Sequence, residues 1–494
     1  MSDSPSAHSE PFGDAGEPEF GAREQLAIWL LLASAFVVIL NETIMSVALP
    51  PVMDDLGITA AVGQWLTTAF LLTMSVVIPI TGMLIQRVDT RPLFIVAMSL
   101  FTAGTLIAAA APGFTMLLLG RVVQAGGTAI MMPLLMTTVV TLVPERQRGR
   151  LMGRIAIVIS VAPALGPTIS GLILEVLDWR WLFIFVLPVA GAALVIGAVK
   201  MPNVGMLRVA RIDVLSVLLS VLSFGGLVYG LSLIGDAANG NALMPPWVAL
   251  VVGALALAAF VARQLRLQRD DRALLDLRTF ETRPYALSVL LFSFSSMALF
   301  GSLILLPIYV QKVLGESTLV TGLLLLPGGL LMGLLGPTVG RMVDSRGARF
   351  MLIPGTGVTA LSMWCMGLFT DATSVWQVLG THLLLSVGLA GVFTPLFSVS
   401  LGSLPKRLAS HGSAMISTAQ QVAGAAGTAL FVTVMTLVSV SVAGSAEAVT
   451  PHSLAAGTRI AFIVGAAVST VGFAISFFVR DQPQPVPGAP DGNA

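Results

Sequence analysis

Long, nearly uninterrupted runs of apolar residues fill most of the chain, and short charged stretches separate them. A helix needs about 20 apolar residues to cross a hydrocarbon core of roughly 30 Å. The runs have this length, and they do not alternate in short segments as the strands of a membrane β-barrel do. The pattern therefore predicts an all-α polytopic membrane protein with fourteen transmembrane helices, near residues 25–48, 64–85, 93–111, 114–138, 151–174, 180–199, 213–234, 246–266, 284–310, 318–338, 350–369, 376–400, 412–437 and 458–479.

The composition supports this class and excludes others. Hydrophobic residues make up 56% of the 494 residues, charged residues make up 10%, and the mean hydropathy is +0.92. No soluble domain needs so much apolar sequence. The single cysteine excludes an intrachain disulfide. The basic residues lie in loops rather than in a clustered patch, so we assign no nucleic-acid role.

Basic residues orient the chain, because Lys and Arg are retained on the cytoplasmic side. An even number of helices places both termini on one side. With the termini inside, most of the 26 Lys and Arg residues fall in cytoplasmic segments. We therefore expect cytoplasmic termini and a location in the bacterial cytoplasmic (inner) membrane.

Glu42 is the only carboxylate that the pattern places deep in a predicted helix, and Arg121 is the only deep base. Counted from the nearest helix end at about 1.5 Å per residue, both lie at a depth of roughly 12 Å. A buried ionisable group costs about 3 kcal/mol and marks function by default. We hypothesise that Glu42 takes and releases a proton, while Arg121 and Gln124 alternately hold the Glu42 side chain. A static ion pair, or a Glu42 that faces the headgroups, is the alternative.

Two short segments repeat one pattern. Residues 82–91 read GMLIQRVDTR and follow the second predicted helix; residues 340–349 read GRMVDSRGAR and follow the tenth. If the tenth helix repeats the second, the seventh and eighth are an insertion, and the layout is six, two, six. The regions are then a disordered cytoplasmic tail (1–24), a six-helix bundle (25–199), two additional helices with cytoplasmic linkers (200–283), a second six-helix bundle (284–480) and a second tail (481–494).

These segments resemble the inter-helix motif of the major facilitator superfamily, and fourteen helices resemble its drug:proton antiporter branch of the EmrB/QacA type. Further segments resemble signatures of that branch. Residues 40–50 (LNETIMSVALP) match its first helix, 117–127 (LLLGRVVQAGG) its fourth and 162–171 (APALGPTISG) its fifth. The resemblance extends from about residue 25 to 480.

The resemblance implies the major facilitator fold and a proton-coupled secondary active exporter, an antiporter that moves amphipathic drugs or other toxic small molecules by alternating access. The expected partners are the small-molecule substrate, protons and the lipid bilayer. The proton gradient would drive transport without a cofactor or metal, and we expect a monomer. A narrow-specificity exporter of one antibiotic, metabolite or lipid precursor is the first alternative. A polytopic receptor or membrane enzyme is the second, although the chain contains no phosphate-binding loop or hydrolase motif.

The chain also departs from the family pattern. Asn41 occupies the position of the first-helix Asp, and Glu42 lies one residue later, about 100° around the helix. In the first inter-helix segment Gln86 occupies the Asp position and Asp89 the Gly position. The proton carrier is therefore not simply inherited, and we expect Glu42 to act together with Asn41 and Arg121.

The fifth predicted helix carries small residues every four positions: Ala162, Gly166 and Ser170. Such a stripe lets a neighbouring helix approach closely. Pro163 and Pro167 remove backbone donors and favour a bend in the same stretch, and Gly171 ends the segment that resembles the family motif. The resemblance implies that this helix lies at the interface on which the two halves rock, which favours export over uptake. Ordinary tight packing without directional meaning is the alternative.

The resemblance also implies a latch at the cytoplasmic helix ends and a substrate cavity. Acids and arginines of the latch would gain from helix dipoles and from each other; arginines that only fix the topology are the alternative. The latch would comprise Gln86, Arg87, Asp89, Arg91, Gly340, Asp344, Arg346, Gly347 and Arg349. The cavity would be lined by Thr43, Trp65, Phe70, Met74, Gln124, Met132, Met136, Phe292, Phe294, Met297 and Gln421, each of which has helix packing or lipid contact as its alternative.

Overall fold

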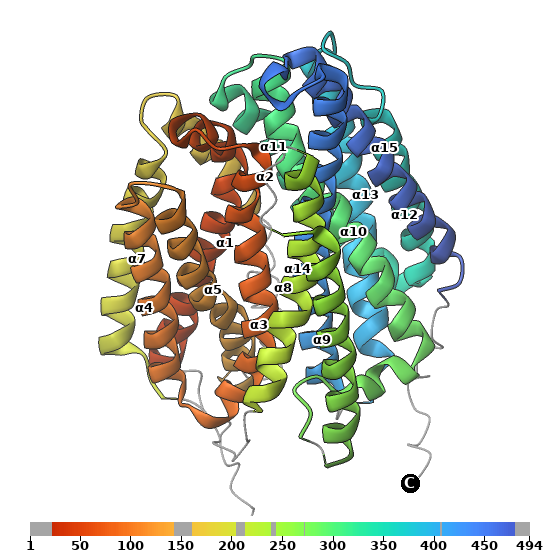
Figure 1. The fold of residues 1–494 in the computed structure, drawn as a ribbon. Helices are drawn as coiled ribbons and strands as arrows, with labels where there is room; N and C mark the ends of the chain where they lie inside the picture. Colours follow the sequence, from red (N-terminus) through yellow and green to blue (C-terminus); the bar gives the residue numbers. More distant parts are fainter. Residues whose placement is uncertain are drawn as a thin grey trace, which may run out of the picture.

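The computed structural model describes residues 22–142, 161–203, 213–238, 244–270, 272–405 and 408–479, and no β-strand occurs among them. The helices stand side by side in one bundle (Figure 1). They are α1 (Ala22–Leu56), α2 (Ala60–Gly63), α3 (Trp65–Arg87), α4 (Thr90–Ala109), α5 (Phe114–Leu142), the unlabelled helix Val161–Leu174, α7 (Arg180–Lys200), α8 (Val214–Ala238), α9 (Pro246–Leu267), η1 (Gln268–Asp270), η2 (Leu277–Glu281), α10 (Arg283–Ile308), the π-helical η3 (Tyr309–Val313), α11 (Thr318–Arg346), α12 (Ala348–Met366), α13 (Val375–Gly402), α14 (Ala409–Ala443), η5 (Ala446–Ala448) and α15 (Pro451–Ser476).

Twelve helices within the described ranges are long and apolar enough to cross a membrane. Two of the fourteen predicted spans are not among these twelve. The predicted span 151–174 is described only from residue 161, where a shorter apolar helix begins, and the predicted span 350–369 corresponds to α12, which has 19 residues. The fold is therefore an all-helical membrane protein, and the count of fourteen spans stays a prediction.

Contacts between helices define two groups and a pair. In the N-terminal group α1 packs on α5 and α7, while α5 packs on α3 and α4. In the C-terminal group α14 packs on α10 and α15, and α13 packs on α11 and α12. Between the groups, α3 contacts α14 and α1 contacts α10. The pair α8 and α9 lies at this seam, where α8 packs against both α3 and α14 (Figure 1).

A charged pair and a buried amide hold α8 to α9. Arg263 of α9 donates from Nε and Nη2 to the two carboxylate oxygens of Asp213, which precedes α8, at 2.6 and 2.7 Å. These hydrogen bonds lower the pKa of Asp213 to about 2. The fully buried Gln264 donates to Oγ of Ser216 at 2.7 Å and accepts from the backbone nitrogen of Leu274 at 2.8 Å. The segment after α9 is thereby fastened to the pair.

α1 is longer than its predicted span, because it continues to Leu56 through Pro50 and Pro51. Proline has no N–H, so Pro51 leaves the carbonyl of Val47 without its helical donor. Nε2 of Gln311, on η3 directly after α10, donates to that carbonyl at 3.1 Å. A side chain of the other group thus satisfies a carbonyl that the proline left free, and the helix tolerates the proline pair.

Arginines gather at one end of the bundle, which we call the basic end. Arg87 and Arg346 lie in the last turns of α3 and α11, and Arg91 and Arg349 lie at the beginnings of α4 and α12. The opposite end contains the last turn of α1 and the first turn of α11. By the retention of positive charge on the inner side, the basic end is expected to be cytoplasmic.

Candidate functional site

Arg121 lies on α5 where this helix packs very closely against α4. A Cβ atom added to Gly104 of α4 would lie 2.4 Å from the backbone nitrogen of Gln124, so only glycine permits the approach. The close packing brings the Gln124 side chain to α4, where its Nε2 donates to Oγ1 of Thr105 at 2.8 Å. Gln124 is thereby fixed with its oxygen free to accept from Arg121.

The Arg121 side chain is fully buried, and its hydrogen-bond partners are all neutral. Its Nη1 donates to Oε1 of Gln124 at 2.8 Å and to the backbone oxygen of Asn41 at 3.5 Å, and its Nε donates to the backbone oxygen of Leu66 at 3.3 Å. Its guanidinium carbon lies 4.2 Å from the centre of the Phe70 ring. Nη2 has no partner among the described residues. A buried cation held by neutral groups alone gains from a counter-charge nearby.

Glu42 of α1 is the acidic residue next to this cation. The residue before it, Asn41, accepts a hydrogen bond from Arg121 through its backbone oxygen, and Glu42 would attract the guanidinium when ionised. The ion pairs found in the described part of the chain do not include one between these two residues. The predicted neighbours thus lie together, but in this conformation Gln124 rather than Glu42 holds the guanidinium.

Asn41 is a buried polar side chain of this site that makes no hydrogen bond within the described ranges. It is 1% exposed, and neither its Oδ1 nor its Nδ2 has a partner among the described residues. Glu42, by contrast, is only partly buried. An unpaired buried amide costs free energy, so a change of side-chain position that gave Asn41 a partner would be favourable. The site therefore has unused hydrogen-bonding capacity at Asn41 and at Nη2 of Arg121.

A cavity of about 540 Å³ lies between the two groups, with walls from α3 and α5 on one side and from α13 and α14 on the other. Its lining reaches Ile85 near the end of α3, Phe397 near the end of α13 and Ser410 at the start of α14. All three positions lie close to the basic end. The cavity is therefore in the basic half of the bundle.

Three of the residues predicted to line a cavity do line this one: Met74, Met132 and Met136. A fourth, Gln421, touches the set, because its Nε2 lies 3.2 Å from the sulfur of Met74. Methionine side chains are flexible and polarizable, and they adapt to ligands of varied shape. The three methionines that were predicted to line a cavity thus do line one.

The other predicted cavity residues do not line this cavity. Phe292 packs on Phe393 with ring centres 4.9 Å apart, and Phe294 lines a separate small cavity inside the C-terminal group. Trp65 packs on a ring of α8. Helix packing, the alternative given for each residue, describes their place in this conformation. The same holds for Thr43, which lies against Gly166, for Phe70 and Gln124, which contact Arg121, and for Met297, which lies against Gly427.

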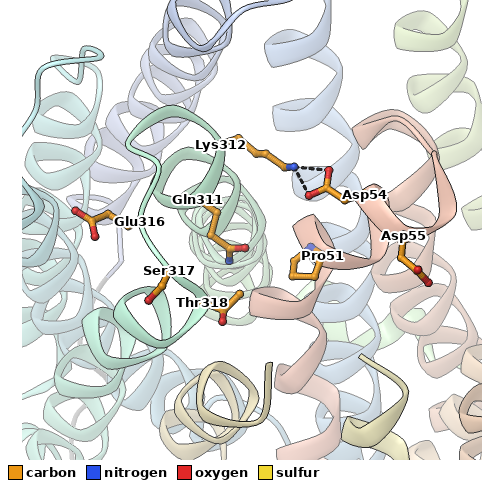
Figure 2. A pocket seen from close by; sticks show the side chains of 8 residues that line it. All are labelled: Pro51, Asp54, Asp55, Gln311, Lys312, Glu316, Ser317 and Thr318. Atoms are coloured by element: carbon orange, nitrogen blue, oxygen red, sulfur yellow. Dashed lines mark hydrogen bonds and ion pairs between the residues drawn. The ribbon is translucent and has the colours of Figure 1, made fainter. Parts of the chain in front are cut away.

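At the opposite end the two groups are joined directly (Figure 2). Nζ of Lys312, on η3, donates to both carboxylate oxygens of Asp54, in the last turn of α1. A pocket of about 620 Å³ surrounds this pair, and Gln311, Glu316 and Thr318 also line it. This outer pocket contains charged groups of both signs. We call the contact between Lys312 and Asp54 the closure; the large cavity of the basic half lies on its other side.

The neighbouring aspartate, Asp55, ties α1 to its own group. It accepts from Nε1 of Trp179 at 2.8 Å and from Nη1 of Arg180 at 3.2 Å. Arg180 also lies 4.2 Å above the ring of Trp179. The end of α1 thus carries two adjacent acids with different tasks: Asp55 anchors the helix to α7, and Asp54 reaches across to the C-terminal group.

The helix Val161–Leu174 packs on α1 with the predicted stripe of small residues. A Cβ added at Gly166 would lie 2.1 Å from Oγ1 of Thr43 and 3.0 Å from the carbonyl oxygen of Leu40. Ala162 and Ser170 are fully buried. The stripe therefore mediates a close approach, as predicted, and its neighbour is α1, the helix that carries Glu42.

The other face of the same helix meets α11 of the C-terminal group. Oγ1 of Thr168 donates to the carbonyl oxygen of Gly322 at 3.1 Å. A Cβ at Gly322 would lie 2.5 Å from the carbonyl oxygen of Pro167, and one at Gly171 would lie 2.4 Å from that of Thr318. Glycines on both sides thus allow the two groups to touch through their backbones.

The first inter-helix segment lies at the basic end. Arg87 ends α3, and Asp89 precedes α4 without a hydrogen bond from its side chain to the helix. Arg91 donates from Nη2 to the carbonyl oxygen of Ala198 in α7 at 2.5 Å. The side chain of Gln86 lies outside the described part of the structure. The latch function of this segment stays a prediction.

The second segment joins α11 to α12 through Gly347, whose φ of 84° is a conformation that favours glycine. The guanidinium of Arg346 lies 4.9 Å from the centre of the Phe350 ring. Asp344 and Arg349 are exposed at this end, and Gly340 faces open space. Here too the predicted latch function is untested.

Two features of the site were not selected from the sequence. Ser410, Ser413 and Ser417 of α14 line the large cavity, and their spacing of three and four residues would have placed them on one helix face. The contact between Asp54 and Lys312 joins residues 258 positions apart. No local sequence signal identifies such a pair.

Two groups of long apolar helices that close on each other at one end and enclose a cavity toward the other form the architecture of a membrane transporter. The chain belongs to the Major Facilitator Superfamily, whose family model matches residues 31–428. The family consists of transporters, not enzymes.

Curated relatives match over most of their length. The "Lincomycin resistance protein LmrB" of Listeria monocytogenes is 40% identical over 453 residues, which cover 91% of this chain and 95% of the relative. The "Multidrug resistance protein B homolog" of Mycobacterium tuberculosis is 30% identical over 482 residues, which cover 91% of this chain and 88% of the relative. Both of these relatives are bacterial, and both names refer to drug resistance.

Solved structures of other transporters share the fold. A bacterial homolog of the human lysosomal transporter Spinster, described as inward-facing and unoccupied, matches with a TM-score of 0.67 at 12% identity, over 94% of this chain and 98% of that chain. The peptide transporter POT in complex with sulfate matches with a TM-score of 0.67 at 14% identity, over 92% and 94% of the two chains. At these identities the likeness shows the fold alone.

Proposed function

We propose that this protein is a proton-coupled secondary active exporter of amphipathic small molecules, an antiporter of the EmrB/QacA type in the bacterial cytoplasmic membrane. The names of its relatives support a drug as the substrate, because two of them refer to resistance. We also propose fourteen spans arranged as six, two and six. This arrangement is supported by the large cavity, since no lining residue within the described ranges comes from α8 or α9.

The observation that carries the proposal is the buried Arg121 with neutral partners beside Glu42. When Glu42 is ionised, its attraction to Arg121 offsets part of the cost of burying both charges. When Glu42 binds a proton, that attraction disappears, and Arg121 is held by Gln124 and by backbone carbonyls alone. Proton binding thus changes which partner of Arg121 is favoured.

α1 provides the route from this site to the closure between the groups. Asp54 lies twelve residues after Glu42 on the same helix, or about 18 Å along its axis. Val47, whose carbonyl accepts from Gln311, lies between them. A shift of α1 that accompanies the proton would therefore act directly on the contacts that close the opposite end. This is the two-state element that alternating access requires.

The test is transport in everted membrane vesicles with lincomycin as the first candidate substrate. The native protein should accumulate lincomycin when a proton gradient is imposed, and a protonophore should abolish accumulation. Glu42→Gln should still bind lincomycin but lose the gradient-driven accumulation. Glu24→Gln is the matched control, because Glu24 lies in the first turn of the same helix. Normal proton-driven accumulation by Glu42→Gln would contradict the proposal.

A narrow-specificity exporter is the second candidate. It is favoured by the name of the relatives that refer to lincomycin alone. A susceptibility panel across antibiotic classes, in a strain with the gene deleted and restored, separates the two candidates. Sensitisation to one class indicates the narrow exporter, and sensitisation to several unrelated classes indicates the multidrug exporter.

A further inference from the structure

The large cavity of the basic half has two chemically different walls. The wall formed by α3 and α5 is mainly apolar. It includes two threonines, Thr128 and Thr137, and Oγ1 of Thr128 donates to a backbone oxygen of its own helix at 3.0 Å. Met74, Ile78, Met132 and Met136 are its main apolar side chains. These side chains offer dispersion contacts and a shape that adjusts to the ligand. One side of a bound molecule would therefore meet mainly thioethers and aliphatic groups.

The facing wall of α14 presents hydroxyl groups. Ser410, Ser413 and Ser417 are spaced by three and four residues, so they follow one another along one face of the helix. None of the three is buried. They form a row of hydroxyls that spans about 10 Å of the cavity wall, since each residue of a helix advances by about 1.5 Å.

In the part of the chain that the structure describes, these hydroxyls have no internal partner, in contrast to two serines of the adjacent cavity helix α13. Ser400 and Ser403 of α13 donate to carbonyl oxygens of their own helix turn at 3.0 and 2.8 Å. By contrast, no hydrogen bond joins the side chain of Ser410, Ser413 or Ser417 to another residue of the described ranges. Each keeps one donor and two acceptor positions for a ligand or for water.

The cavity lining that the structure describes contains no Asp, Glu, Lys, Arg or His. Glu42 and Arg121 lie outside the lining in this conformation. A permanent cation that left water for such a site would lose hydration without gaining a counter-charge, which is costly. An uncharged molecule with several hydroxyl or amide groups on one side would instead exchange hydrogen bonds with water for hydrogen bonds with the serines.

We infer that this cavity selects uncharged amphiphiles that have one apolar face and one face rich in hydroxyl or amide groups, with Ser413 and Ser417 as specificity-determining residues. The inference names a substrate class for the proposed exporter and rests on that function. It narrows the expectation of amphipathic drugs to molecules without a permanent positive charge.

The test compares two compounds that share one apolar body, 4-butylphenyl glucoside and 4-butylphenyl trimethylammonium. Their equilibrium binding to the full-length purified protein is measured in lipid nanodiscs without a proton gradient. The glucoside should bind about tenfold more tightly than the ammonium compound. Equal or tighter binding of the ammonium compound would overturn the inference.

Variants show whether the serines cause the difference. Ser413→Ala and Ser417→Ala should each weaken binding of the glucoside about threefold to tenfold, the effect of one lost neutral hydrogen bond, and leave the ammonium compound unchanged. Ser417→Asp should strengthen binding of the ammonium compound, because it places a carboxylate in the lining. Ser441→Ala is the matched control, since Ser441 is exposed near the far end of the same helix.

Failure of the inference and failure of the proposed function have different signatures. Unchanged glucoside binding in both alanine variants would overturn the inference, even if the protein exports lincomycin. Selective binding that depends on the serines, found in a protein that shows no gradient-driven export of any bound compound, would support the site and contradict the proposed transport function. The binding measurement uses no gradient, so the two results are independent.

Discussion

The close contact between Gly166 and α1 can be broken by one substitution, Gly166→Leu. The first atom added, Cβ, would lie 2.1 Å from Oγ1 of Thr43 and 3.0 Å from the carbonyl oxygen of Leu40. Ordinary carbon contacts begin near 3.4 Å, so α1 and the helix Val161–Leu174 would have to separate by more than roughly 1 Å. The rest of the leucine side chain would require a further displacement.

The expected cost follows from this geometry. Overpacking of a close-packed interior costs about 1–3 kcal/mol, and Gly166→Leu should lie at the upper end because a backbone carbonyl is among the atoms it meets. α1 carries Glu42, Val47 and Asp54, so its displacement should also disturb the Arg121 site and the closure at the opposite end. We therefore expect a protein that inserts and folds but does not transport.

Three measurements check this prediction: membrane insertion, thermal unfolding of the purified protein and gradient-driven lincomycin accumulation. Gly191→Leu is the control, because a Cβ at Gly191 of α7 meets nothing within 4 Å. Gly166→Ala should give a milder loss of stability. Part of that loss should return in the double variant with Thr43→Ala, which removes the nearest atom. Native stability and native transport in Gly166→Leu would refute the close contact with α1.

Three further outcomes are expected. Arg121→Ala should leave Glu42 without its counter-charge, so Glu42 should hold its proton more tightly and substrate-induced proton release should move to higher pH; Arg121→Lys should shift it less, and an unshifted release profile in Arg121→Ala would show that the two groups are not coupled. Lys312→Asp should break the contact with Asp54 and raise the population of the state that is open at the end opposite the basic end, so a cysteine introduced there should be labelled faster. Asp54→Lys in the same protein should restore the native labelling rate. The shift of this equilibrium should be small, about 1 kcal/mol, because the pair is partly exposed. Asp213→Asn should lower stability by about 1 kcal/mol at pH 7. Because the pKa of Asp213 is lowered to about 2, the native advantage should be complete above the unfolded pKa and disappear as the pH falls through 2; a pH-independent difference in melting temperature would contradict this account.

Features that depend on local chemistry could be predicted from the sequence. Apolar length alone located the long helices of the described ranges, because a hydrocarbon core imposes nearly the same requirement on every span. The recurrence of Ala162, Gly166 and Ser170 predicted a close helix contact, which the structure confirms at Gly166. The methionines at 74, 132 and 136 were expected at a cavity and line one. The span lengths and the small-residue stripe could be recognised within single helices, whereas the methionines were placed by the family resemblance.

Features that join distant segments required the tertiary structure. The sequence placed Glu42 and Arg121 at one depth, but only the packing of α4 on α5 decides that Gln124 holds the guanidinium. Likewise, aromatic residues such as Phe292 were expected at the cavity, while the structure packs that ring against Phe393.

The pair of Asp54 and Lys312 depends on tertiary packing most of all. These residues are 258 positions apart, and each alone is an ordinary charge at a helix end. Hydrophobic burial in a bilayer constrains every helix separately and in the same way. Which helix faces contact each other depends on close contacts at glycines, on carbonyls that lack a helical donor because of proline, and on charge pairs between helices. These are properties of the assembled bundle.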